Sequence, residues 1–195
     1  MNSKELFVRD TTVIKQSDNL YTAEVSENWS IGNTANGGYS MTLAAKAMSE
    51  FLEHKDPLSI SAHYLDRVDF GSTEFHVTHL SSSKSLSTAR VELIQDNKIK
   101  IIFIGTFTDF SFKNDMNIYE RDVPNFPEYN SCEVIPYKEG FNPKLDKNIE
   151  KAYSQDSLWW KKDIDNSSST LNLYMSWPEK DLSLIHISEP TRQFR

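Results

Sequence analysis

The sequence predicts an α+β fold in which one long helix is followed by an antiparallel meander of strands. Two observations carry this prediction. A helical pattern rich in alanine runs from Tyr39 to His54, and four segments with strand patterns follow it between residues 58 and 110. Strands that are gathered after a helix are typical of α+β folds, and the sequence shows no alternation of single strands with helices.

The helical segment carries small side chains on several of its sides. Its apolar residues recur at helical spacing: Met41, Ala44, Ala45, Met48, Phe51 and Leu52. A thin and largely apolar helix favours a position wrapped by a sheet over one on the surface. Asn36-Gly37-Gly38 marks a tight turn able to cap this helix, and Asp56-Pro57 is expected to end it.

Strand patterns surround the helical segment. After the helix they cover Leu58 to Leu65, Ser72 to Leu80, Leu86 to Gln95 and Lys98 to Phe110, and before it they cover Thr11 to Gln16 and Asn19 to Val25. Asp96-Asn97 predicts a hairpin turn between the last two strands, whereas Glu27 to Ala35 is polar and is expected to form a loop.

The last third of the chain has the pattern of a second unit without a long helix of its own. Residues 111–130 are polar and are predicted to be a linker. Strands are expected near Cys132 to Ile135 and at Thr170 to Trp177, and Trp159-Trp160 is expected to pack beneath their sheet. The predicted domains are therefore 7–110 and 131–181.

Composition bounds the class of protein. The 195 residues are 38% hydrophobic and 25% charged, with a formal net charge of −7, which argues against a nucleic-acid partner. No segment approaches the roughly 20 apolar residues of a membrane span, and the N-terminus lacks the pattern of a signal peptide. A cytoplasmic location follows as an expectation. The histidines lack partners at ligand spacing, so no metal site is predicted.

The segment with the most chemical content is the turn before the helix. Gly37 and Gly38 allow another group to approach the backbone closely. At the start of a helix, free N–H groups and the positive end of the dipole stabilise an oxyanion that develops from a carbonyl. The alternative is a plain turn and cap in which the glycines serve geometry alone.

A resemblance to a known family adds to this interpretation. Trp29, the run Asn36-Gly37-Gly38-Tyr39, the run Asp56 to Leu65 and the run Val91 to Gln95 fall in the order seen in TesB-like acyl-CoA thioesterases. The match covers Tyr21 to Phe107 and continues weakly to Trp177-Pro178. One departure is Ser83-Lys84-Ser85, where family members often carry a Gly-Arg pair.

The resemblance implies a hotdog fold, a long central helix wrapped by a curved antiparallel sheet, followed by a truncated second hotdog. It implies hydrolysis of acyl-CoA thioesters to free fatty acid and CoA, with no cofactor. Asn36, Gly37, Gly38 and Tyr39 are the expected substrate-binding residues, and the N–H of Gly38 or of Tyr39 is the expected contact for the carbonyl. The catalytic Asp, Thr and Gln of the family belong to its second hotdog, so they have no counterpart in this chain. Hotdog pockets form between two domains, which implies a homo-oligomer or a tandem-domain pair.

The end of the chain carries a different signature. Leu182 to Arg192 match the translation of a transposon-end adapter used in preparing sequencing libraries. Residues 182–195, with His186, are therefore expected to be a non-native tail. We expect the native sequence to continue past Asp181 into a complete second hotdog and the printed chain to be inactive.

Two other classes of protein remain open. One is a hotdog module that binds acyl-CoA or lipid without hydrolysing it. The other is a helix-grip lipid-binding domain, in which a long helix also meets a curved sheet. Helix-grip folds place that helix late in the chain, whereas here it precedes most strands. The order of the elements therefore favours the hotdog.

Overall fold

The structure is a computed structural model that describes residues 1–111, 126–161 and 170–179. The chain divides into two compact units. Glu5–Asn117 form the first, called here the helix–sheet unit, and Met1–Lys4 with Ile118–Arg195 form the second, the small-sheet unit. The predicted linker is described only at its two ends, and the predicted tail at 182–195 lies outside the described residues.

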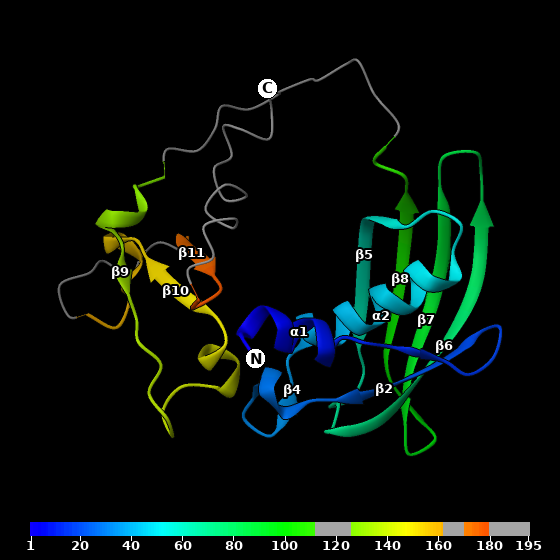
Figure 1. Ribbon diagram of the computed structural model, residues 1–195, viewed down its shortest axis with the longest axis horizontal. Helices are drawn as coiled ribbons and strands as arrows, with labels where there is room; N and C mark the ends of the chain where they lie inside the picture. Colours follow the sequence, from blue (N-terminus) through cyan, green and yellow to red (C-terminus); the bar gives the residue numbers. More distant parts are fainter. Residues whose placement is uncertain (112–125, 162–169, 180–195) are drawn as a thin grey trace. The chain divides into compact units, whose positions relative to one another are not determined.

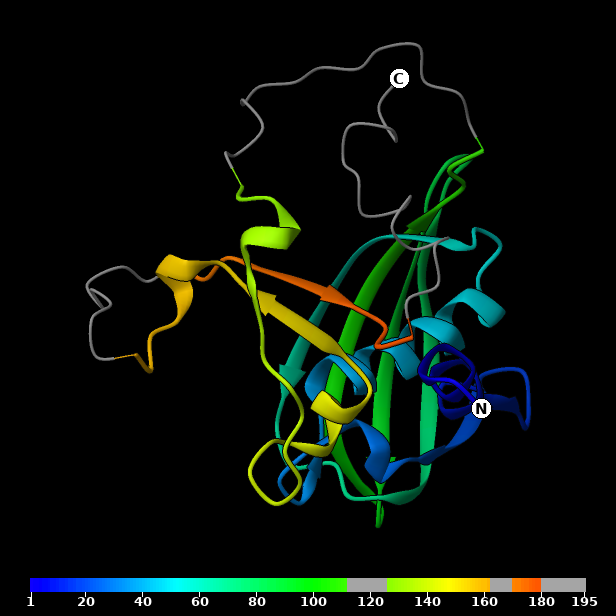
Figure 2. The ribbon, with the colours of Figure 1, turned by 60° about the vertical axis from the view of Figure 1, so that its left-hand side comes forward.

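The helix–sheet unit is built on one antiparallel sheet whose strands run in the order β1-β2-β6-β7-β8-β5. The strands are β1 (Ile14–Lys15), β2 (Leu20–Val25), β5 (Asp56–Tyr64), β6 (Gly71–Ser82), β7 (Ser87–Gln95) and β8 (Lys98–Thr108). The helix α2 (Gly37–Phe51) lies across one face of this sheet (Figure 1), and the long strands curve around it (Figure 2). The predicted α+β architecture is therefore confirmed.

The core lies between α2 and the concave face of the sheet. Alternate residues of β7 are buried, including Ala89, Val91 and Leu93, as the period-2 pattern predicts. The helix buries Tyr39, Ser40, Leu43, Ala44, Ala47 and Met48. Of the apolar residues that recur at helical spacing, Ala44, Met48 and Leu52 are buried, whereas Met41, Ala45 and Phe51 are half-buried.

Several predicted boundaries are corrected by the structure. The helix ends at Phe51, and Asp56-Pro57 opens β5 instead of ending the helix. The expected loop at 27–35 contains the short helix η1 (Glu27–Trp29) and a small hairpin of β3 (Ser30–Ile31) and β4 (Thr34–Ala35). The helix α1 (Ser3–Asp10) was not predicted, because an 8-residue helix depends on tertiary packing more than on its own pattern.

The hairpin turn predicted between β7 and β8 is confirmed. Asp96 and Asn97 have φ angles of 51° and 58°, and they join two strands that pair directly at Gln95 and Lys98. Positive φ at both central residues is the geometry of a type I′ turn, and its twist matches that of the flanking strands.

The small-sheet unit has three antiparallel strands in the order β11-β10-β9. They are β9 (Glu133–Val134), β10 (Glu150–Tyr153) and β11 (Leu173–Ser176). The short helix η2 (Tyr129–Ser131) precedes β9, and η3 (Lys144–Lys147) and η4 (Gln155–Ser157) lie between the strands. The prediction that the tryptophan pair packs beneath the sheet is wrong, because Trp159 is 64% exposed and Trp160 is 43% exposed. Leu158 is the fully buried residue here. The assignment of this unit to an incomplete hotdog stays a prediction.

Candidate functional site

The turn before α2 is an N-terminal cap made by Asn36. Its side-chain oxygen accepts the amide hydrogens of Gly38 at 2.9 Å and of Tyr39 at 3.2 Å. Its own backbone amide donates to the Trp29 carbonyl at 2.9 Å, and its carbonyl accepts the Ser40 amide at 3.0 Å. The predicted capping turn is present, so Asn36 itself occupies two of the four free amide groups of the first turn.

Gly37 is the first-turn residue whose backbone amide the Asn36 side chain does not bind. Its backbone amide meets no hydrogen-bond acceptor among the residues that the structure describes. Its carbonyl accepts a hydrogen bond at 3.1 Å from the hydroxyl of Tyr64, the last residue of β5. A Cβ at Gly37 would lie 2.9 Å from atoms of the Tyr64 side chain, so this position has no room for a side chain as long as Tyr64 stays in place.

Tyr39 differs from the three residues before it, because its side chain points into the core. It is 3% exposed. Its hydroxyl donates to the Asp10 carbonyl at 2.6 Å and accepts the Ser26 amide hydrogen at 3.1 Å. Burial raises the pKa of the Tyr39 hydroxyl above its ordinary value. Of the four predicted binding residues, Tyr39 therefore offers no exposed side chain to a ligand, and its backbone amide already donates to Asn36.

Asp10 lies behind this turn, and the sequence did not reveal it as part of the site. Its carboxylate is 5% exposed and accepts hydrogen bonds from Arg9 Nε at 2.7 Å, Asn28 Nδ2 at 2.9 Å and Trp29 Nε1 at 3.1 Å. Burial alone would raise the pKa of Asp10, but hydrogen bonds, that from Asn28 foremost, hold it below its ordinary value. Asp10 is therefore a buried carboxylate that stays ionised.

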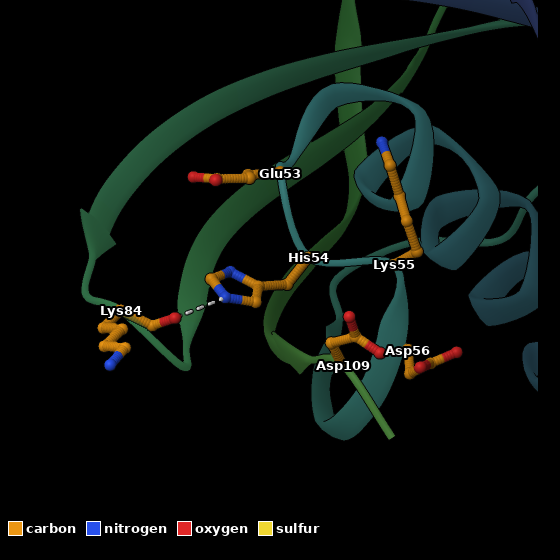
Figure 3. Close-up of a pocket in the computed structure, with 6 residues that line it drawn as sticks. All are labelled: Glu53, His54, Lys55, Asp56, Lys84 and Asp109. Atoms are coloured by element: carbon orange, nitrogen blue, oxygen red, sulfur yellow. Dashed lines mark hydrogen bonds between the residues drawn. The ribbon is translucent and has the colours of Figure 1, made fainter. Parts of the chain in front are cut away.

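The opposite end of α2 holds a pocket of about 250 Å³ lined by six residues, which Figure 3 labels: Glu53, His54, Lys55, Asp56, Lys84 and Asp109. His54 Nδ1 lies 2.6 Å from Ser87 Oγ, and its Nε2 lies 3.3 Å from the Lys84 carbonyl. Lys55 Nζ donates to the Leu52 carbonyl at 2.6 Å, and the Asp56 carboxylate accepts the Phe110 amide at 2.8 Å. The contacts of His54 join the end of α2 to the β6–β7 hairpin, so the described polar contacts here are made within the fold.

Lys84, which stands in place of the family's Gly-Arg pair, is not brought to the turn at Asn36. Its carbonyl contacts His54, which follows the C-terminal end of α2. A helix of 15 residues is roughly 22 Å long, so Lys84 and the Asn36 cap lie at opposite ends of it. The structure assigns Lys84 no part in the candidate site.

The described residues also bear on the other predicted functions. Glu50, in the last turn of α2, and Glu53, just after the helix, are both exposed. Within residues 1–111, 126–161 and 170–179, no three histidine, cysteine or carboxylate side chains are placed to hold a metal ion. No helix in these ranges combines the length and the apolar character that crossing a bilayer requires.

Comparison with known proteins shows that one segment of the chain is similar to a known family. Residues 25–108 match the family model described as the acyl-CoA thioesterase N-terminal domain. This segment contains the Asn36 cap, α2 and β5 to β8, and it ends at the last residue of β8. No curated protein sequence is similar enough to this chain to count as a relative.

Solved structures show the same fold. A candidate thioesterase II of Thermobifida fusca has a TM-score of 0.70 at 20% identity, over 80% of this chain and 58% of its own. A hot dog protein of unknown function from Alicyclobacillus acidocaldarius has 0.66 at 11%, over 76% and 55%. The acyl-CoA thioesterase II TesB2 of Mycobacterium marinum has 0.64 at 13%, over 88% and 60%.

These similarities establish the hotdog fold for the helix–sheet unit and leave the helix-grip alternative without support. At such low identity they show the fold alone. The chain spans only 55% to 60% of the length of these three proteins. What a whole protein of this kind does is therefore a separate question from what this chain folds into.

Proposed function

We propose, given that residues 25–108 match the model of the acyl-CoA thioesterase N-terminal domain, that the full-length protein hydrolyses acyl-CoA thioesters to free fatty acid and CoA. One structural observation supports this proposal above the others. The first turn of α2 presents the unpaired Gly37 amide beside Gly38, which is exposed, so a carbonyl group can reach the backbone there.

In the proposed reaction, water adds to the thioester carbonyl carbon, and the carbonyl oxygen becomes an oxyanion. The carbon–sulfur bond then breaks, and the CoA thiolate takes up a proton as it leaves. The Gly37 amide and the positive end of the α2 dipole stabilise the oxyanion. Asn36, Gly37, Gly38 and Tyr39 are the proposed substrate-binding residues. The amides of Gly38 and Tyr39 donate to Asn36, so Gly37 is the preferred carbonyl contact.

Among residues 5–111, the described part of the helix–sheet unit, we identify no base for this reaction. Activation of the attacking water requires a group such as a carboxylate within hydrogen-bond reach of it. Glu50, in the last turn of α2, and Glu53, just after the helix, are exposed, and the Asp10 carboxylate is enclosed by its donors. We therefore propose that the base comes from the second hotdog of the full-length protein and that the 195-residue chain alone is inactive.

The same observation favours a second candidate function. Without a base, a hotdog with an open helix start binds acyl-CoA or another lipid thioester and does not hydrolyse it. A site completed by a second domain, in tandem or in a homo-oligomer, is proposed in either case. The cytoplasmic location expected from the N-terminal sequence stays a prediction.

A thiol-release assay separates these functions. The full-length protein encoded at the native locus is given short, medium and long acyl-CoAs, and the 195-residue chain is assayed beside it. Turnover by the full-length protein alone supports the proposed thioesterase. Binding of acyl-CoA by the full-length protein without release of thiol would replace it with the binding module.

A further inference from the structure

We propose that Asp10 is a positioning residue of the acyl-CoA site, and that its carboxylate acts through Trp29 to hold the first-turn amides of α2 in the orientation that a thioester carbonyl requires. This inference rests on the proposed function, because it assigns a role toward the same substrate. Asp10 lies outside the segment 25–108 that matches the family.

The first step of the argument is the contact between Asp10 and η1. Asp10 is the last residue of α1, and its Oδ2 accepts both the Trp29 indole hydrogen at 3.1 Å and an Asn28 amide hydrogen at 2.9 Å. The other carboxylate oxygen accepts from Arg9 Nε at 2.7 Å. Both carboxylate oxygens of Asp10 therefore accept hydrogen bonds. The Trp29 indole can rotate only if the buried carboxylate loses one of its donors, which is unfavourable.

The second step runs from Trp29 to the cap of α2. Trp29 is 1% exposed, and its carbonyl accepts the Asn36 amide hydrogen at 2.9 Å. Asn36 in turn holds the amides of Gly38 and Tyr39. A displacement of the Trp29 backbone therefore moves the cap, and with it the direction in which the Gly37 amide points.

The third step closes the network through side chains. The Trp29 ring stacks against Tyr39 with centroids 6.2 Å apart, and Phe7 of α1 meets Trp29 edge-on at 4.9 Å. The Tyr39 hydroxyl donates to the backbone carbonyl of Asp10 at 2.6 Å. Residues 10, 29 and 39 thus form a ring of contacts in which the start of α2 is anchored to the end of α1.

Burying the Asp10 carboxylate between α1 and the start of α2 costs desolvation free energy. Apolar side chains of similar volume often replace buried ion pairs without loss of stability. Hydrogen bonds to a carboxylate are stronger than those between neutral groups, so the Asp10 carboxylate holds its three donors firmly in place. Orientation of a backbone amide matters in the transition state, where the oxyanion forms, more than in substrate binding.

The test compares Asp10→Ala, Asp10→Asn and Trp29→Phe in the full-length protein. Trp29→Phe keeps an aromatic ring but removes the indole donor together with part of the buried ring volume. We expect kcat to fall by roughly tenfold to a hundredfold in Asp10→Ala at nearly unchanged KM, with smaller losses in the other two. Ser87→Ala is the matched control, since it removes a buried hydrogen bond at the opposite end of α2. It is expected to lower Tm and leave kcat unchanged well below its unfolding temperature.

A second measurement does not depend on activity. Amide hydrogen exchange of the 195-residue chain compares the first turn of α2, at Gly38 and Tyr39, with the middle of the helix at Ala44. Asp10→Ala is expected to speed exchange at the first turn by about tenfold beyond any change at Ala44, whereas Ser87→Ala is expected to change the two together.

The outcomes separate this inference from the proposed function. If the full-length protein releases no thiol, the proposed function is overturned, and with it the positioning role of Asp10 in that reaction. The exchange data still decide whether Asp10 holds the first turn of α2. If the full-length protein is active and Asp10→Ala matches Ser87→Ala in kcat and in exchange, Asp10 is a structural residue only and the inference fails.

Discussion

The hydroxyl of Tyr64 donates a hydrogen bond to the carbonyl of Gly37 over 3.1 Å, and the tyrosine ring fills the space in which a Cβ at Gly37 would lie. Two segments far apart in the sequence therefore meet at the candidate site. Tyr64 is 53% exposed, so its ring contacts the helix start from the solvent side. The close fit makes the effect of a substitution at Gly37 depend on the residue at position 64.

The change in the free energy of unfolding caused by Gly37→Ala is expected to be about 1 kcal/mol more favourable in a Tyr64→Ala background than in the wild type. The reason is that alanine at position 64 removes the clash with the new Cβ at position 37. Denaturant unfolding of the two single variants and the double variant measures this coupling. Gly38→Ala is the matched control, since a Cβ there meets only Asn36 Oδ1, at 3.1 Å. Equal effects of Gly37→Ala in both backgrounds would contradict the observed packing.

Asn36→Ala is expected to lower the free energy of unfolding by about 1 kcal/mol, because it removes the acceptor of two first-turn amides. Asn36→Asp keeps an acceptor oxygen and adds a charge that the helix dipole favours, so its stability should match or exceed that of the wild type. Thermal unfolding compares the variants. A loss of the same size in both would show that the side chain does not act as a cap.

Ser87→Ala is expected to cost about 1 to 2 kcal/mol, because it leaves His54 Nδ1 buried without its partner at 2.6 Å. Chemical denaturation measures the loss. Ser85→Ala, in the same hairpin, removes an exposed hydroxyl and should change stability little. If the two variants are equally stable, the contact between His54 and Ser87 contributes nothing to folding.

Asp10 predicts a specific dependence of stability on pH. The pKa of Asp10 is lowered in the folded state relative to its ordinary value of 3.8. The ionised carboxylate therefore contributes its full stabilisation at pH values above 3.8, and this stabilisation is lost as the pH falls through the lower pKa of the folded state. The stability difference between the wild type and Asp10→Asn should therefore be constant near neutral pH and shrink below about pH 4. Denaturant midpoints measured across this range test the sign. A difference that grows toward acid would show that Asp10 is not ionised when folded.

Regular local patterns made much of the fold predictable. The alternation that predicted β7 places Ala89, Val91 and Leu93 against the helix, where all three are fully buried. The turn at Asp96-Asn97 and the cap at Asn36 were also predicted, because each depends on the chemistry of a few neighbouring residues. The boundary of α2 at Phe51 was missed, since no residue type at that position marks a helix end.

The site was only half visible in the sequence. The glycines at 37 and 38 marked a place of close approach, but nothing local connected them with Asp10, Trp29 or Tyr64. Similarly, whether Trp159 is buried depends on which residues from distant parts of the chain pack over it, and the local sequence Trp159-Trp160 does not specify those residues.

The sequence by itself determined the α+β class, the order of helix and strands and the position of the open helix start, because side-chain periodicity and turn chemistry act over a few residues. Only the tertiary structure decided that Tyr64 closes over Gly37 and that the Asp10 carboxylate lies behind Trp29. Such contacts join residues distant in the chain, and they are selected by packing and by the need of every buried charge for donors.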